Sequence, residues 1–143
     1  MRRNTIFINV AIALAAVLTL TACGGGAGTS SSDVAIKSAQ AGNLTITLSS
    51  PTGQLKKGPN DLTLSFADAS GRTVDVGAAS LKFHMPAMGS MAEMNDIATL
   101  TTTNAPGRYR AKVDIEVEGT WEANISYQGP QGTGQTSMNV QAK

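Results

Sequence analysis

Four methionines and the only histidine of the chain stand together in one short segment. The methionines recur at steps of three, directly after the histidine: His84, Met85, Met88, Met91 and Met94. A thioether sulfur is soft and carries no proton at biological pH, so a methionine cluster can bind Cu(I) or Ag(I). An imidazole suits copper in either oxidation state, which makes His84 a natural further ligand. The segment therefore predicts a soft-metal site of three sulfurs, or of two sulfurs and one nitrogen.

The same methionines have two other interpretations. Methionine is a flexible gap-filler, so two or three of these side chains could plug one end of a fold without any metal. A methionine-rich surface can also repack against partners of different shape, which makes a contact surface the third interpretation. The neighbouring Glu93 and Asp96 are hard oxygen donors, mismatched to Cu(I), and we expect them only to keep the segment in solvent.

The remaining composition excludes most other kinds of site. The chain of 143 residues holds one Cys and one His. These totals rule out a blue-copper set of two His and one Cys, a CxxC redox pair, a zinc site of several Cys and His, and an intrachain disulfide. No serine nucleophile and orienting aspartate stand beside His84 in sequence, and no glycine-rich phosphate motif follows a strand pattern. We therefore expect no enzymatic activity.

The N-terminal segment indicates export. Residues 1–4 are basic, and the apolar run at residues 6–20 is shorter than the ~20 residues that a membrane-spanning helix requires. The run ends in Leu-Thr-Ala-Cys, which resembles a bacterial lipobox, in which the cysteine receives a diacylglycerol. We therefore expect residues 1–22 to be a signal peptide. Cys23 is then the lipid attachment site, neither a redox thiol nor a metal ligand.

Removal of the signal leaves a chain that is anchored but not basic. Without its two arginines the count falls from 11 basic and 10 acidic residues to 9 and 10, a net charge of −1. That balance leaves nothing to hold nucleic acid. The sequence GGGAGTSSSD after the cysteine predicts a flexible tether, so residues 23–33 comprise the lipidated cysteine and the tether. Gly24 favours the periplasmic side of the outer membrane in a Gram-negative host, and an extracytoplasmic membrane anchor otherwise.

Residues 34–143 show the period-two alternation of β-strands and no helical period over three turns. Tyr109 and Trp121, near the starts of two late segments, are expected to pack in the core. About seven strands separated by turn residues predict one all-β domain, an antiparallel β-sandwich. The strand candidates lie at residues 44–48, 62–66, 73–76, 79–83, 97–103, 109–113, 121–127 and 137–140.

The methionine segment itself fits neither regular element. Methionines at steps of three would alternate between the two faces of a strand. On a helix three of them would gather on one side. Pro86 and Gly89 argue against a regular helix. We therefore expect a loop that contains a helical turn.

Several motifs in order along the chain resemble the YtkA-like domain, which is related to the FixH type. The resemblance covers roughly residues 42–141 and implies an immunoglobulin-like β-sandwich, here at residues 34–143, exported across the cytoplasmic membrane. It also implies association with heavy-metal efflux, copper handling or cytochrome oxidase assembly. The motifs are G-x-N-x-L (Gly58, Asn60, Leu62), MPxMxxM (Met85, Pro86, Met88, Met91), PGxY (Pro106, Gly107, Tyr109) and GxW (Gly119, Trp121).

The resemblance carries Met85, Met88 and Met91 over as site residues, and His84 and Met94 extend the cluster in this chain. The periplasmic copper chaperones of oxidase assembly present a second His-x-Met pair, which a chain with one histidine cannot complete. Two functions stay open. The lipoprotein holds Cu(I) or Ag(I) and buffers or passes on the ion, or it is a metal-free module that docks on an efflux or oxidase-assembly component. Sulfurs that converge at an exposed point, with His84 among them, favour the first, and buried, diverging sulfurs favour a plug.

Overall fold

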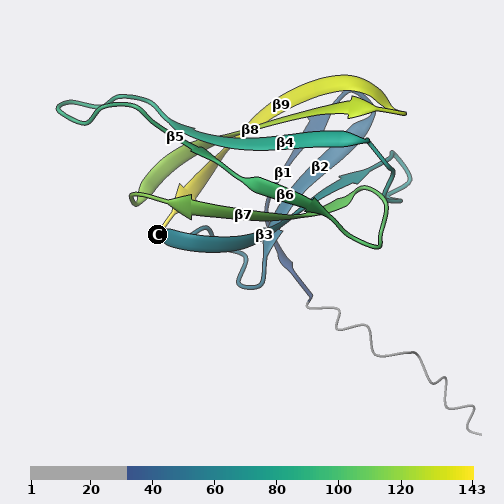
Figure 1. Ribbon diagram of the computed structural model, residues 1–143, viewed down its shortest axis with the longest axis horizontal. Helices are drawn as coiled ribbons and strands as arrows, with labels where there is room; N and C mark the ends of the chain where they lie inside the picture. Colours follow the sequence, from purple (N-terminus) through teal and green to yellow (C-terminus); the bar gives the residue numbers. More distant parts are fainter. Residues whose placement is uncertain (1–31) are drawn as a thin grey trace, which may run out of the picture.

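The computed structural model describes residues 32–143 (Figure 1). The expected signal peptide, the lipid attachment expected at Cys23 and the expected tether up to residue 31 lie outside these described residues. In the part of the chain that the structure covers, no helix is long and apolar enough to span a membrane. Nine strands form the domain: β1 (Val34–Ala41), β2 (Leu44–Ser50), β3 (Gly58–Ala67), β4 (Ala78–Met85), β5 (Met94–Ile97), β6 (Thr99–Thr102), β7 (Arg108–Ile115), β8 (Gly119–Gly129) and β9 (Gly132–Ala142).

The strands pack as two antiparallel sheets. One sheet has the order β1-β2-β3-β7-β6, and the other has the order β5-β4-β8-β9. Apart from the additional outer strand β1, these orders are the A-B-E-D and C′-C-F-G sheets of an immunoglobulin-like domain. The prediction of an all-β, immunoglobulin-like antiparallel β-sandwich is therefore confirmed, with nine strands where about seven were expected.

Two differences from the expected strands lie in segments without clean alternation. Strand β1 was not anticipated, because as an edge strand it is largely exposed on both faces and shows no period-two pattern. Asp33 immediately precedes β1, and its carboxylate accepts a hydrogen bond from the Thr63 hydroxyl of β3 at 2.5 Å. The strand expected at residues 73–76 is wrong: Thr73 makes only one isolated bridge, to Ala67.

A third difference concerns the strand expected at residues 97–103, which is split between the two sheets. Strand β5 ends at Ile97 in the four-stranded sheet, and β6 begins at Thr99 in the five-stranded sheet. Between them Ala98 is buried, and its N–H donates to the Leu81 carbonyl at 3.0 Å. The chain therefore crosses from one sheet to the other at a single small residue, which a run of β-branched residues does not reveal.

The inner faces of the two sheets enclose one hydrophobic core. Tyr109 and Trp121 are 5% and 0% exposed, as expected of core residues. Phe66 meets the rings of Tyr109 and Tyr127 edge-on, with ring centroids 5.7 and 5.6 Å away. The nine strands and this core lie within residues 32–143, so that segment has a hydrophobic core of its own, which a domain requires to fold alone. The other large, fully buried side chains are Phe83, Ile46, Leu48, Leu55, Leu62, Leu64, Leu81, Ile115, Ile125 and Val76.

The loops at one end of the sandwich pack tightly on each other. A Cβ atom on Gly107 would lie 2.1 Å from the Val74 carbonyl oxygen, so only glycine fits there. The Tyr109 hydroxyl donates to the Gly77 carbonyl at 2.7 Å, and burial raises the pKa of this hydroxyl. Gly77 immediately precedes β4, whose other end is Met85. This closed end is therefore opposite to the methionine segment.

Candidate metal site on the methionine hairpin

The methionine segment is the hairpin that joins β4 to β5 and reaches beyond the rest of the sandwich (Figure 1). Met85 pairs in register with Met94. Farther out, Met88 and Met91 form an isolated antiparallel bridge, in which their backbone N–H groups donate to each other's carbonyls at 3.1 and 2.9 Å. The expected loop is present at residues 86–93, but the helical turn expected in it is wrong, because the loop is an extended hairpin.

The spacing of three has a simple explanation in this geometry. A two-residue turn, which begins with Gly89 at a φ of +58°, lies between Met88 and Met91. Met85 and Met94 follow three residues farther along each arm. A single period along the segment would require one continuous element, whereas the chain reverses at the centre of the segment. The four methionines therefore form two cross-strand pairs.

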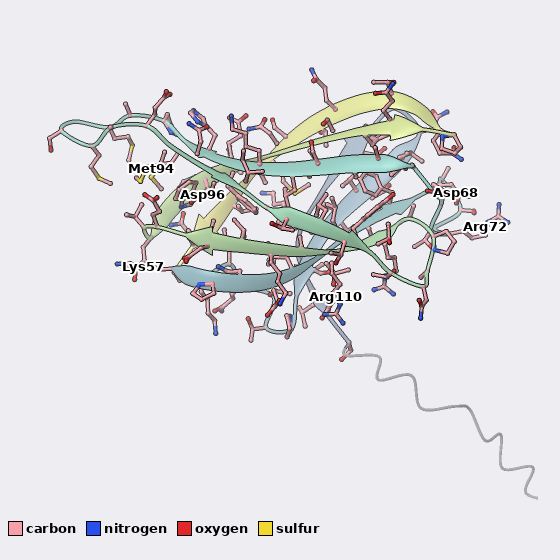
Figure 2. The ribbon with its side chains drawn as sticks, viewed as in Figure 1. Lys57, Asp68, Arg72, Met94, Asp96 and Arg110 are labelled. Carbon is pink, nitrogen blue, oxygen red and sulfur yellow. The ribbon has the colours of Figure 1, made fainter. Side chains whose placement is uncertain are left out.

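The two pairs differ in their exposure to solvent. We call Met85 and Met94 the base pair, and Met88 and Met91 the tip pair. Met85 is 4% exposed, and its terminal methyl lies against Gly119, where a Cβ atom would approach it to 3.0 Å. Met94 is partly buried against the core near the base of the hairpin (Figure 2). Met88 and Met91 are 63% and 45% exposed, so the base pair fills the end of the core and the tip pair faces solvent.

His84 does not join the base pair. On β4 the residues Leu81, Phe83 and Met85 are buried, while His84 alternates with them and faces away from the core. Its Nδ1 atom makes a hydrogen bond of 3.0 Å with the Oδ1 atom of Asn95. Four residues of extended strand span about 13 Å, so His84 also lies well behind the tip pair. The structure thus brings the four methionines to one hairpin and separates the histidine from them.

The two acidic residues of the hairpin have different surroundings. Glu93 is exposed, as expected, whereas Asp96 on β5 is only partly exposed, and its Oδ2 atom has no hydrogen-bond partner among the described residues. Within residues 32–143, no group of three or more His, Cys, Asp and Glu side chains could hold a metal ion.

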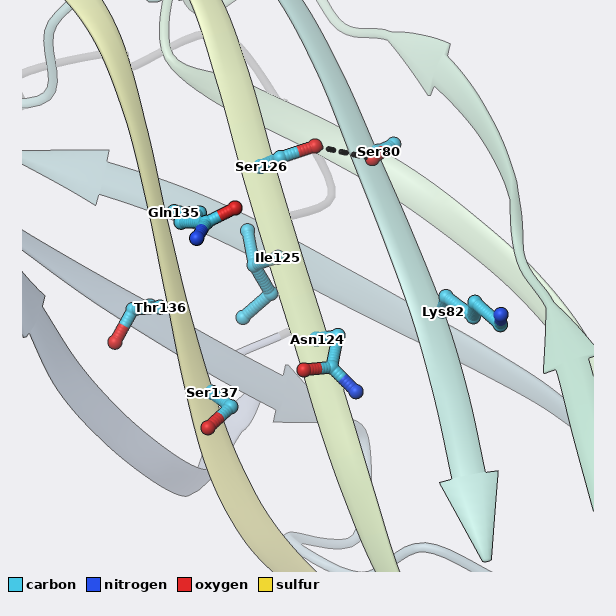
Figure 3. Close-up of a pocket in the computed structure, with 8 residues that line it drawn as sticks. All are labelled: Ser80, Lys82, Asn124, Ile125, Ser126, Gln135, Thr136 and Ser137. Carbon is cyan, nitrogen blue, oxygen red and sulfur yellow. Dashed lines mark hydrogen bonds between the residues drawn. The ribbon is translucent and has the colours of Figure 1, made fainter.

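The outer face of the four-stranded sheet carries a separate, open hollow of about 440 Å³ (Figure 3). The sequence does not reveal this hollow, because its residues come from three strands that only the fold places side by side. Six of its eight lining residues carry a hydroxyl or amide group, and the hydroxyls of Ser80 and Ser126 share a hydrogen bond of 2.7 Å. It offers neither soft ligands nor an acid–base pair. The lining residues are Ser80, Lys82, Asn124, Ile125, Ser126, Gln135, Thr136 and Ser137.

Comparison with known proteins supports the resemblance seen in the motifs. The YtkA-like family model matches residues 38–126, which is more than half of the chain. The match begins within β1, includes the methionine hairpin and ends within β8. No curated protein and no solved structure matches the chain. On the family match, the chain belongs to the YtkA-like family.

Proposed function

We propose that this protein is an exported lipoprotein that binds Cu(I) or Ag(I) at the tip of its methionine hairpin and buffers the ion or passes it on. The observation that carries the proposal is the tip pair, in which two exposed thioethers stand directly opposite each other. Cys23 would anchor the chain by lipid on the periplasmic side of the outer membrane in a Gram-negative host, or on an extracytoplasmic membrane surface otherwise. The tip would then work where free thiols are oxidised but thioethers persist.

The geometry of the tip pair suits a shared ion. Directly opposed residues of an antiparallel pair have Cβ atoms about 4.5–5.5 Å apart. The unbranched methionine side chain can bring its sulfur to a common point from that separation. Thioethers favour Cu(I) over the harder divalent cations. With two neutral donors the ion keeps open coordination positions, which suits exchange with an acceptor.

The test is a competition titration of residues 32–143 with Cu(I) or Ag(I) against a chromogenic chelator. We expect the double substitution Met88→Leu and Met91→Leu to weaken binding at least about tenfold, a change of about 1.4 kcal/mol. Leucine preserves side-chain volume, so this change removes sulfur while keeping the apolar surface. His84→Gln and the buried Met138→Leu serve as controls, with affinities expected within about twofold of wild type because neither side chain lies at the tip. Equal competition by wild type and the double variant would remove the metal proposal.

The alternative proposal is a metal-free module whose hairpin docks on a metal-efflux or oxidase-assembly component. It is favoured by the same exposure, because 63% and 45% exposed methionines at a projecting tip form an apolar contact surface. Leucine at Met88 and Met91 would preserve this contact, whereas glutamate would abolish it. Growth of the source cells in silver salts therefore separates the two proposals. Leucine variants that protect as well as wild type, with glutamate variants that do not, favour docking.

A further inference from the structure

We infer that the ion at the hairpin tip is shared by two copies of this chain. Met88 and Met91 of one copy supply two sulfurs, and the same two residues of a second copy supply two more. This inference rests on the proposed function, because it specifies how the metal site is completed. It adds a partner, a second copy of the chain, that completes a four-sulfur site.

One chain offers few accessible donors for the ion. Met85 is 4% exposed and packed on Gly119, and Met94 is partly buried against the core. His84 lies on the outer face of β4 and is hydrogen-bonded to Asn95. Of the five candidate ligands, one chain therefore presents two accessible thioethers. A Cu(I) or Ag(I) ion accepts up to four soft donors, so two further coordination positions are open to donors from outside the chain.

Two hairpin tips can approach each other closely. The residues around the tip pair are small: Ala87, Gly89, Ser90 and Ala92. A Cβ atom built on Gly89 would meet nothing within 4 Å, so the turn is open on that side. The hairpin also reaches beyond the sandwich (Figure 1), so two tips can meet while the bodies of the two domains stay apart.

Charge and symmetry both favour a two-fold contact between the tips. Between Met85 and Met94 the only ionisable side chain is Glu93, so two facing tips bring together one carboxylate each. A monovalent cation between them offsets part of that repulsion. The tip pair flanks its turn, so a two-fold axis through the ion would place identical donors on both sides. Such an isologous contact closes on itself and gives a dimer, not a filament.

The experiment is sedimentation velocity of residues 32–143 in a chloride-free nitrate buffer with increasing Ag(I). This segment omits Cys23, whose free thiol would bind silver on its own account. We expect a monomer without silver and a species of twice the mass at half an equivalent of silver per chain. In excess silver the monomer should return, because each tip pair then holds its own ion. The matched controls are Met85→Leu, which should dimerise like wild type, and the Met88→Leu, Met91→Leu double variant, which should stay monomeric.

The possible failures are distinguishable. If silver competes for the tip in the chelator titration but the chain stays monomeric at every ratio, the shared site is wrong and the proposed function stands. A monomeric wild type that binds no more silver than the double variant overturns both. A silver-dependent dimer that persists in the double variant places the bridge elsewhere and overturns the shared tip site.

Discussion

At one end of the sandwich the connecting loops pack into the molecule, and at the other end the methionine hairpin extends away from it. At the closed end Gly107 lies against the backbone of Val74, and Tyr109 is hydrogen-bonded to Gly77. At the hairpin end Gly89 has no neighbour that a Cβ atom would touch. Both ends use glycine turns, but only the closed end makes them part of the packed interior. The hairpin end is therefore where the fold can present side chains for binding without a large cost in stability.

The methionines repeat this contrast within the hairpin itself. Met85 is 4% exposed and Met88 is 63% exposed, although only two residues separate them. The first fills space at the end of the core, as the plug interpretation expected, while the second is free to bind. One cluster in the sequence therefore corresponds to two environments, one buried and one exposed. The following predictions compare the two ends of the sandwich and then these two environments.

The largest change in the free energy of unfolding is expected from alanine substitutions of the turn glycines at the two ends. Gly107→Ala places a Cβ atom 2.1 Å from a backbone oxygen at a φ of +76°, so we expect it to lower the free energy of unfolding by about 3 kcal/mol or more. Gly89→Ala has the space but keeps a φ of +58°, and should cost about 1 kcal/mol. Urea denaturation of residues 32–143 measures both. Equal losses would mean that the hairpin end is packed as tightly as the closed end.

The next largest difference in the free energy of unfolding is expected between the two methionine pairs. Met85→Ala leaves a cavity beside Gly119 and should lower the free energy of unfolding by about 3 kcal/mol. Met88→Ala removes an exposed side chain and should change it by less than about 0.5 kcal/mol. The control Met85→Leu conserves volume and should cost less than about 1.5 kcal/mol. A Met88→Ala loss comparable to that of Met85→Ala would show that the tip also contributes to packing.

The smallest expected effect is a difference in the rate of methionine oxidation. Peroxide converts methionine to its sulfoxide most readily where the sulfur is exposed. We expect Met88 and Met91 to oxidise at least about tenfold faster than Met85 and Met138, which are 4% and 5% exposed. Peptide mass spectrometry after timed treatment measures each site, and prior addition of silver should slow oxidation at the tip pair alone. Oxidation at one common rate would contradict the division of the hairpin into base and tip.

The regular part of the fold could be predicted from local pattern. Leu44, Ile46 and Leu48 alternate with polar residues because one face of the strand is buried, and the same holds for Leu62, Leu64 and Phe66 in their own strand. The parts that could not be predicted are governed by contacts between distant segments. Strand β1 lacks alternation because it lies at a sheet edge, and the run from 97 to 103 divides because Ala98 crosses between sheets.

The sequence by itself determined the chemical inventory: one histidine, one cysteine after an apolar run, and four methionines within ten residues that confine any soft-metal chemistry to one segment. It also determined the all-β class and the family motifs. Only the tertiary structure decided which donors are accessible. Exposure depends on where a strand ends and which face of the sheet is covered, so the β4–β5 register buries Met85, turns His84 outward and leaves Met88 and Met91 in solvent.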